Sequence, residues 1–229
     1  MKRFFSCILL LTAVVIPSQA ASPKYVALTF DDGPSGKYTQ SLLDGLALRG
    51  VHATFLLCGY RMEQYPDITQ RIFEEGHEIG YHGFSHKSMR DMSRKTIGQE
   101  LIDSRALLPE NCDPVFFRPP GGIVTDGVRQ VAEARQLALL SWSVDPKDWA
   151  TTSVGSIESA VLKKIRDGDI ILLHDMTVSS VQAALDIVDT LQQQGYRFVT
   201  VSELAKLRNT PIRPGRMYGK FPPKEESVK

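Results

Sequence analysis

The stretch TFDDGPS (residues 29–35) places two adjacent carboxylates, Asp31 and Asp32, directly after a short apolar run, YVAL (residues 25–28). The length and composition of this run suit a buried strand. Gly33-Pro34 then turns the backbone away, so the acids stand where the strand ends. Two carboxylates in one cavity are costly unless a cation or a proton separates their charges. An acidic surface turn is the competing interpretation of these residues taken alone.

After this stretch the sequence alternates between strand-like and helical segments with short connections. Strands are expected at residues 25–28, 53–58, 78–82, 115–118, 138–144, 170–173 and 197–201. Helices are expected at residues 38–48, 67–75 (with a start as early as Glu63), 93–108, 124–135, 156–166, 180–194 and 202–207. Such alternation is typical of parallel strands linked by crossover helices in an α/β fold. The count of about seven strands is one or so short of a standard eight-fold (β/α) barrel, and an open doubly wound sheet is the competing architecture.

The first twenty residues have the pattern of a signal peptide. Met1-Lys2-Arg3 is cationic, the apolar run from Phe4 to Ile16 follows, and small residues lead to Ala20. The apolar run is short for a membrane span. We therefore expect export with cleavage after Ala20, and an uncleaved N-terminal anchor is the alternative.

The charge of the chain argues against a polyanionic partner. Cleavage would remove Lys2 and Arg3 and change the net charge from +1 to −1, so we expect no nucleic-acid binding. Residues 21–207 are long and apolar enough for one domain, which we expect to be a monomer. The basic, proline-containing segment 208–229 is expected to be a solvated, largely disordered tail, or a weak electrostatic anchor to an anionic cell surface.

Polar side chains recur at the C-terminal ends of the predicted strands. They are Asp31 and Asp32 after the first strand, His82 and His86 after the third, Arg118 after the fourth, Asp145 and Asp148 after the fifth, and His174 after the sixth. In parallel α/β folds these ends converge on one face, where functional sites are built. We therefore expect these residues to share one site.

The spacing of His82 and His86 lets two imidazoles reach one metal ion. Two histidines four apart are a weak signal by themselves. With a carboxylate from another strand they make a set of two histidines and one acid, which leaves coordination positions free for water and substrate. Hydrolytic zinc sites use this number of ligands. A second carboxylate that is not a ligand would then be available as a base.

Five ordered motifs resemble those of the polysaccharide deacetylases, the NodB-homology enzymes of carbohydrate esterase family 4. The motifs are TFDDGP (29–34), HGFSH (82–86), RPPGG (118–122), DPKDW (145–149) and LLH (172–174), and the resemblance runs from about Lys24 to Leu207. It implies a distorted (β/α) barrel of seven or eight strands. It also implies hydrolysis of N-acetyl groups on aminosugars with a divalent metal, usually zinc, with cobalt or nickel as alternatives.

The resemblance also implies roles for individual residues. The implied metal ligands are Asp32, His82 and His86. Asp31 would be the general base that accepts a proton from the attacking water. His174, oriented and charged by Asp148, would be the acid that protonates the departing amine. Asp175 could compete with Asp148 as the partner of this histidine, and Asp145 could simply cap its loop.

The remaining motif positions are implied to position the substrate. Arg118 would pair with the base, the backbone N–H of Gly121 would hold the oxyanion, and Trp149 and Leu172 would line a pocket for the acetyl methyl group. Two positions depart from the family pattern. Gly83 replaces the usual Ser or Thr after the first histidine, and Gly121 stands where an aromatic residue is frequent, which puts the substrate preference in question.

Three functions are compatible with these residues. The first is metal-dependent deacetylation of an extracellular N-acetylated glycan, with peptidoglycan favoured over chitin oligomers. The second is deacylation of another N- or O-acylated carbohydrate such as acetylated xylan. The third, a glycan-binding module without activity, predicts degraded motifs, whereas the motifs here are intact. Cys58 and Cys112 remain after cleavage, and a disulfide and two buried thiols are both compatible with the sequence.

Overall fold

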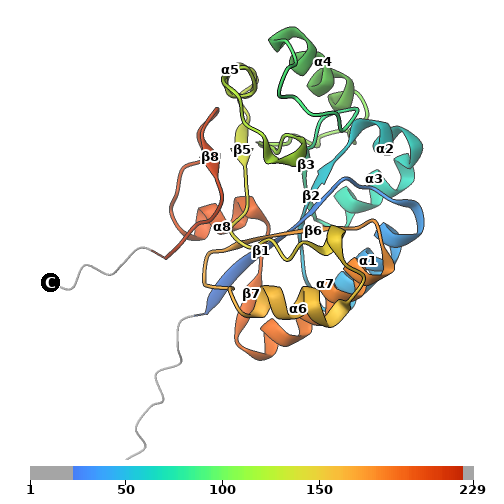
Figure 1. Cartoon of the computed structure of the whole chain (residues 1–229), viewed down its shortest axis with the longest axis vertical. Coiled ribbons are helices and arrows are strands. Elements are labelled where there is room, and N and C mark those ends of the chain that lie inside the picture. Colours follow the sequence, from blue (N-terminus) through green and yellow to red (C-terminus); the bar gives the residue numbers. More distant parts are fainter. Residues whose placement is uncertain (1–22, 224–229) are drawn as a thin grey trace, which may run out of the picture.

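A computed structural model describes residues 23–223 (Figure 1). The predicted signal peptide, residues 1–20, lies outside the described residues. Among the residues described, none of the helices combines the length and the apolar character needed to cross a membrane. Cys58 and Cys112 are buried free thiols, so the alternative of a disulfide between them is wrong.

Within residues 23–223, eight strands form one curled sheet in which every strand pair is parallel. Their order is β6-β1-β2-β3-β4-β5-β8, and β7 pairs with the start of β1. The strands are β1 (Lys24–Asp31), β2 (Thr54–Leu57), β3 (Glu78–Tyr81), β4 (Phe116–Phe117), β5 (Ala138–Leu140), β6 (Ile170–His174), β7 (Tyr196–Phe198) and β8 (Met217–Tyr218). The first seven in chain order were predicted.

The two edges of this sheet meet through isolated bridges. Val144, after β5, pairs in parallel with Ile171 of β6, and Asp169 pairs antiparallel with Lys220. These bridges connect the segments that follow β5 and β8 to the region of β6. The sheet therefore forms the distorted barrel that the family resemblance implies, and the open doubly wound alternative is wrong.

Helices surround the sheet (Figure 1). They are α1 (Gly36–Leu48), α2 (Gly59–Gln64), α3 (Pro66–Glu74), α4 (Arg94–Arg105), α5 (Asp126–Ala134), α6 (Val154–Leu162), α7 (Val178–Gln193) and α8 (Val201–Leu207), with short 3₁₀ helices η1 (Pro120–Gly122) and η2 (Asp148–Ala150). Glu63 belongs to α2 and does not begin α3. The two helices are separate because Tyr65 leaves helical geometry (φ −133°, ψ 60°) immediately before Pro66.

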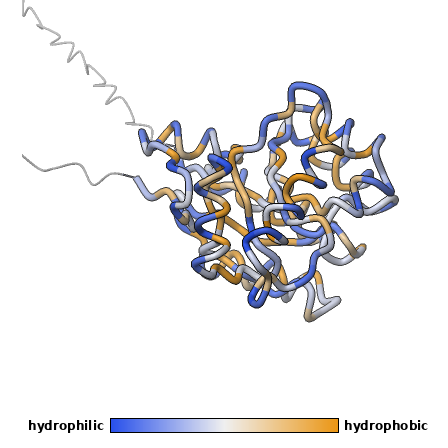
Figure 2. Tube along the Cα trace, turned by 90° about the horizontal axis from the view of Figure 1, so that it is seen from above, coloured by the Kyte–Doolittle hydropathy of each residue, from blue (hydrophilic) through white to orange (hydrophobic). Residues whose placement is uncertain are grey.

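Alternation along β1 sorts its side chains between two environments. Val26, Leu28 and Phe30 belong to the large core between the sheet and the outer helices, whereas Ala27 belongs to a smaller cluster inside the barrel. Figure 2 shows the apolar segments in the interior of the fold and the hydrophilic ones at its periphery. The same alternation points Asp31 into the barrel, toward the site.

The C-terminal segment 208–223 is an ordered part of the domain, which corrects the expected boundary at residue 207 and the expected disorder. Tyr218 of β8 pairs with Leu140 of β5, and its hydroxyl donates to Pro211 O at 3.0 Å. Tyr218 and Phe221 are buried and stack with ring centroids 5.3 Å apart. Burial of these rings outweighs the basic composition on which the prediction of disorder rested. Residues 224–229 lie outside the described residues.

Candidate active site

The adjacent acids Asp31 and Asp32 enter one cavity because the backbone departs from strand geometry between them. Asp31 ends β1 and points inward, and simple alternation would send the next side chain outward. Asp32 instead has a φ of 74°, in the left-handed region that non-glycine residues seldom adopt. This turn brings both carboxylates to the same cleft, where they lie with His82, His86 and His174.

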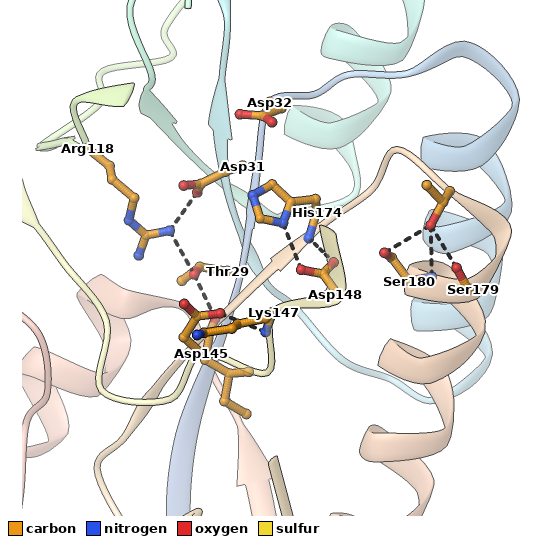
Figure 3. A network of polar contacts seen from close by, with 12 residues as sticks. Thr29, Asp31, Asp32, Arg118, Asp145, Lys147, Asp148, His174, Ser179 and Ser180 are labelled. Carbon is orange, nitrogen blue, oxygen red and sulfur yellow. Dashed lines mark hydrogen bonds and ion pairs between the residues drawn. The ribbon is translucent and has the colours of Figure 1, made fainter. Parts of the chain in front are cut away.

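Arg118 and Asp31 form a buried ion pair across the barrel (Figure 3). The guanidinium is fully buried and donates to Asp31 Oδ1 at 2.6 Å, to Thr29 Oγ1 at 3.0 Å and to Ser141 O at 2.9 Å. These bonds fix the direction of the carboxylate. The predicted contact between Arg118 and Asp31 is confirmed.

Asp32, His82 and His86 form a candidate metal site. Asp32 Oδ1 lies 3.2 Å from His82 Nε2 and 2.9 Å from His86 Nε2, and one ligand atom from each residue lies within 4.8 Å of the others. His82 follows β3 directly, while His86 has a φ of 57° that turns its ring back toward the first histidine. The predicted trio therefore comes together in space.

The hydrogen bonds around this trio suit a cation. His82 Nδ1 lies 2.6 Å from the backbone O of Arg118, and because a carbonyl only accepts, this nitrogen carries the proton. His82 Nε2 then presents a lone pair toward Asp32 Oδ1, which is buried and has no hydrogen-bond partner among the described residues. Lone pairs that converge in this way fit a divalent metal.

His174 and Asp148 form a second ion pair beside the trio (Figure 3). Asp148 Oδ1 lies 2.8 Å from His174 Nδ1, and its Oδ2 accepts from the backbone N–H of His174 at 2.8 Å. Burial lowers the pKa of His174, but the bond to Asp148 and the nearby carboxylates raise it to about 9. His174 is also the register partner of Asp31 on the neighbouring strand. The imidazolium is thus held next to the buried carboxylate.

A cleft of about 320 Å³ joins these groups. Its lining also includes the predicted positions Gly121, Trp149 and Leu172; Leu172 is buried, whereas Trp149 is 67% exposed and stands at the rim. The left-handed φ of Gly121 (66°) turns the backbone of η1 along the cleft.

Trp142 is a residue of the cleft that the sequence interpretation missed. The Arg118 guanidinium lies 5.6 Å from its ring centroid. A Cβ added at Gly122 would stand 2.6 Å from the Trp142 ring, so this close approach requires glycine. The second glycine of the RPPGG motif therefore makes room for an aromatic wall. An aromatic residue near the C-terminal end of a predicted strand was the available signal.

Glu100 of α4 is a second missed residue. Its Oε2 accepts from the backbone N–H groups of Phe84 and Ser85 at 2.8 and 2.7 Å, and its Oε1 accepts from Ser85 Oγ at 2.8 Å. These three bonds hold the loop that carries His86. Gly83, the departure from the family pattern, has a φ of 80° and approaches Met89 so closely that a Cβ would clash. A charged residue in the middle of a helix gave no sequence signal for this contact.

The two remaining acids, Asp145 and Asp175, do not contact the side chain of His174 through a hydrogen bond or ion pair. Asp145 lines the cleft and accepts from Lys147 N at 2.8 Å, so it caps its loop. Asp175 does not pair with His174: its carboxylate accepts from Thr39 Oγ1 in α1. The preference for Asp148 as the histidine's partner is confirmed.

Comparisons with known proteins agree with this geometry. Residues 18–140 match the family model described as Polysaccharide deacetylase. A peptidoglycan-N-acetylglucosamine deacetylase of Bacillus cereus is 39% identical over 192 residues, which cover 81% of this chain and 90% of the relative. The deacetylase PgdA of Listeria monocytogenes is 35% identical over 197 residues, which cover 84% of this chain but 42% of that longer protein.

A solved structure shares the whole architecture. The family 4 acetyl xylan esterase of Clostridium thermocellum, in complex with a cobalt ion, superposes with a TM-score of 0.80 at 37% identity. The match covers 87% of this chain and 100% of that one. Fold, site geometry and sequence matches lead to the same conclusion: this chain belongs to the polysaccharide deacetylase family of carbohydrate esterases.

Proposed function

We propose that this protein is a metal-dependent hydrolase that removes N-acetyl groups from N-acetylglucosamine residues of peptidoglycan. One observation carries the proposal: an arginine-paired carboxylate, Asp31, and an acid-paired imidazole, His174, face one cleft beside a candidate metal site. The likeness to the deacetylase of Bacillus cereus supports the choice of glycan. The signal-peptide pattern before Ala20 supports export to where peptidoglycan lies.

Asp32, His82 and His86 would hold the divalent metal, for which two nitrogens and one carboxylate suit zinc, with cobalt or nickel as substitutes. When bound, such an ion polarises the acetamide carbonyl and lowers the pKa of a nearby water. His82 is prepared for this role because its Nδ1 proton is committed to the backbone O of Arg118.

Asp31 would act as the general base. Its pairing with Arg118 fixes the direction of the carboxylate, which would accept a proton from the water that attacks the carbonyl carbon. The backbone N–H of Gly121, which lines the same cleft, would donate to the oxygen on which negative charge develops. Trp149 and Leu172 would contact the acetyl methyl group.

His174 would act as the general acid. With a pKa of about 9 it carries its proton at neutral pH, and with Nδ1 committed to Asp148 it would donate from Nε2 to the departing amine. The C–N bond then breaks, leaving acetate and a free amino group on the sugar.

Acetate release tests this function. The metal-loaded protein is incubated with purified peptidoglycan, chitin oligomers and acetylated xylan, beside a chelator-treated control. We expect the fastest release from peptidoglycan and none after chelation. The likeness to an acetyl xylan esterase favours O-deacetylation as the second candidate, and preferential release from xylan would select it. Absence of acetate from all three substrates would refute both.

A further inference from the structure

Asp175 is a buried carboxyl group with no role in the proposed chemistry. It directly follows the acid His174, yet its side chain points away from the cleft and is 0% exposed. Within residues 23–223 its Oδ1 has no hydrogen-bond partner. Burying a carboxyl group costs free energy unless hydrogen bonds compensate for the lost water. The hydrogen-bond partners of Asp175 therefore indicate which part of the structure it stabilises.

The hydrogen bonds of Asp175 go to the turn between β1 and α1 and to the first turn of α1. Its Oδ2 accepts from Thr39 Oγ1, and its backbone O accepts from Ser35 Oγ. The same Thr39 hydroxyl accepts from the backbone N–H of Ser35 at 2.6 Å. A Cβ added at Gly33 would stand 2.6 Å from Asp175 Oδ1, so the carboxyl lies directly against the turn.

This turn follows the two acids of the cleft. Asp32 has left-handed backbone geometry, which a non-glycine residue keeps only when its surroundings hold it. Cys58 N donates to Gly33 O at 3.0 Å and fixes the turn from the side of β2, and Asp175 fixes it from the side of β6. The turn therefore has a support on each neighbouring strand.

We propose that Asp175 and Thr39 are positioning residues, which lock the Asp31-Asp32 turn to the strand end that carries His174. This inference rests on the proposed function, in which Asp31 is the base, Asp32 a metal ligand and His174 the acid. Asp175 and Thr39 connect the turn that carries the first two to the strand end that carries the third. Strand pairing aligns Asp31 with His174, but it ends there. Beyond the last pair, the contacts of Asp175 set how far the turn can move from the acid. A displacement of about 1 Å between catalytic groups is enough to reduce turnover.

The test compares three variants of threonine. Thr39→Val removes the hydroxyl and keeps the shape, and Thr39→Ser restores the hydroxyl. Thr69→Val is the matched control, since Thr69 is also a buried helical threonine, and its hydroxyl donates to the backbone O of Tyr65, just before its helix, at 3.1 Å. The readouts are kcat and KM for acetate release from soluble peptidoglycan fragments, the Co²⁺ dissociation constant from its visible absorption, and the thermal midpoint.

In Thr39→Val we expect kcat to fall about tenfold with KM unchanged, and Co²⁺ to bind about tenfold more weakly, as for other residues that support metal ligands. Thr39→Ser should recover both, and Thr69→Val should lose thermal stability only. Equal kcat and Co²⁺ affinity in Thr39→Val and Thr69→Val would overturn the inference. If the wild-type protein neither binds Co²⁺ nor releases acetate, the proposed function itself fails, which is a distinct result.

Discussion

Replacing Asp148 by asparagine should move the alkaline limb of the activity profile. In the wild-type protein Asp148 accepts both from the backbone N–H of His174 and from its ring Nδ1, at 2.8 Å each. Asparagine offers one oxygen in place of two, and its amide N–H suits an imidazole that has lost the Nδ1 proton. The substitution therefore removes a negative charge and favours the neutral ring.

The size of the effect follows from the pKa of His174. Asp148 is the main reason that this pKa is about 9 and not 6.5. At about 1.4 kcal/mol per unit, the environment favours the imidazolium by roughly 3 kcal/mol. At pH 7.5 a group with a pKa of about 9 is about 97% protonated, and one with a pKa of about 6.5 is about 9% protonated. We expect Asp148→Asn to lower kcat/KM about tenfold at this pH.

The assay is the pH dependence of kcat/KM for acetate release at constant metal loading. Wild-type activity should persist to about pH 9 and fall above it, because the acid then loses its proton; the variant should begin to fall near pH 6.5. The matched control is Asp145→Asn, which removes a carboxylate from the same cleft without a bond to His174. An alkaline limb that stays near pH 9 in Asp148→Asn would refute the assignment of His174 as the acid.

Four further changes test other parts of the structure. Asp31→Asn should keep the bound metal and lower kcat by about 10²–10⁴-fold, since a general base is lost; equal turnover would remove the base assignment. His82→Ala should lose both metal and turnover, as measured by elemental analysis and acetate release, and a fully loaded variant would contradict the ligand set. Burial raises the pKa of Asp175 from 3.8 to about 7, so the wild type should lose about 3 kcal/mol of stability between pH 4 and 7 relative to Asp175→Asn; parallel denaturation profiles of the two would argue against a buried proton. Deletion of residues 208–229 should cost about 3–6 kcal/mol in denaturant unfolding, because two aromatic rings lose their burial, and an unchanged midpoint would mean that β8 adds no stability.

Sequence patterns predicted the parts of this protein that depend on local periodicity. Apolar runs alternating with amphipathic segments identified the first seven strands, and a polar residue at the end of a parallel strand must lie at the same rim as its neighbours. Asp31, His82, Arg118 and His174 were therefore assigned to one site before any contact was known. The missed strand β8 has two residues in a basic, proline-containing segment, so no periodicity marked it.

Only the tertiary structure decided how these side chains face one another. The left-handed backbone at Asp32 and His86 turns their ligand atoms together, and no local rule assigns such angles to Asp or His in advance. The contacts of Glu100 with the histidine loop, and of Asp175 with Thr39, join residues 15 to 136 positions apart in the chain. Periodicity reports which face of an element is buried. The direction of a side chain in a loop depends instead on hydrogen bonds and packing from distant segments, which exist only once the barrel has closed.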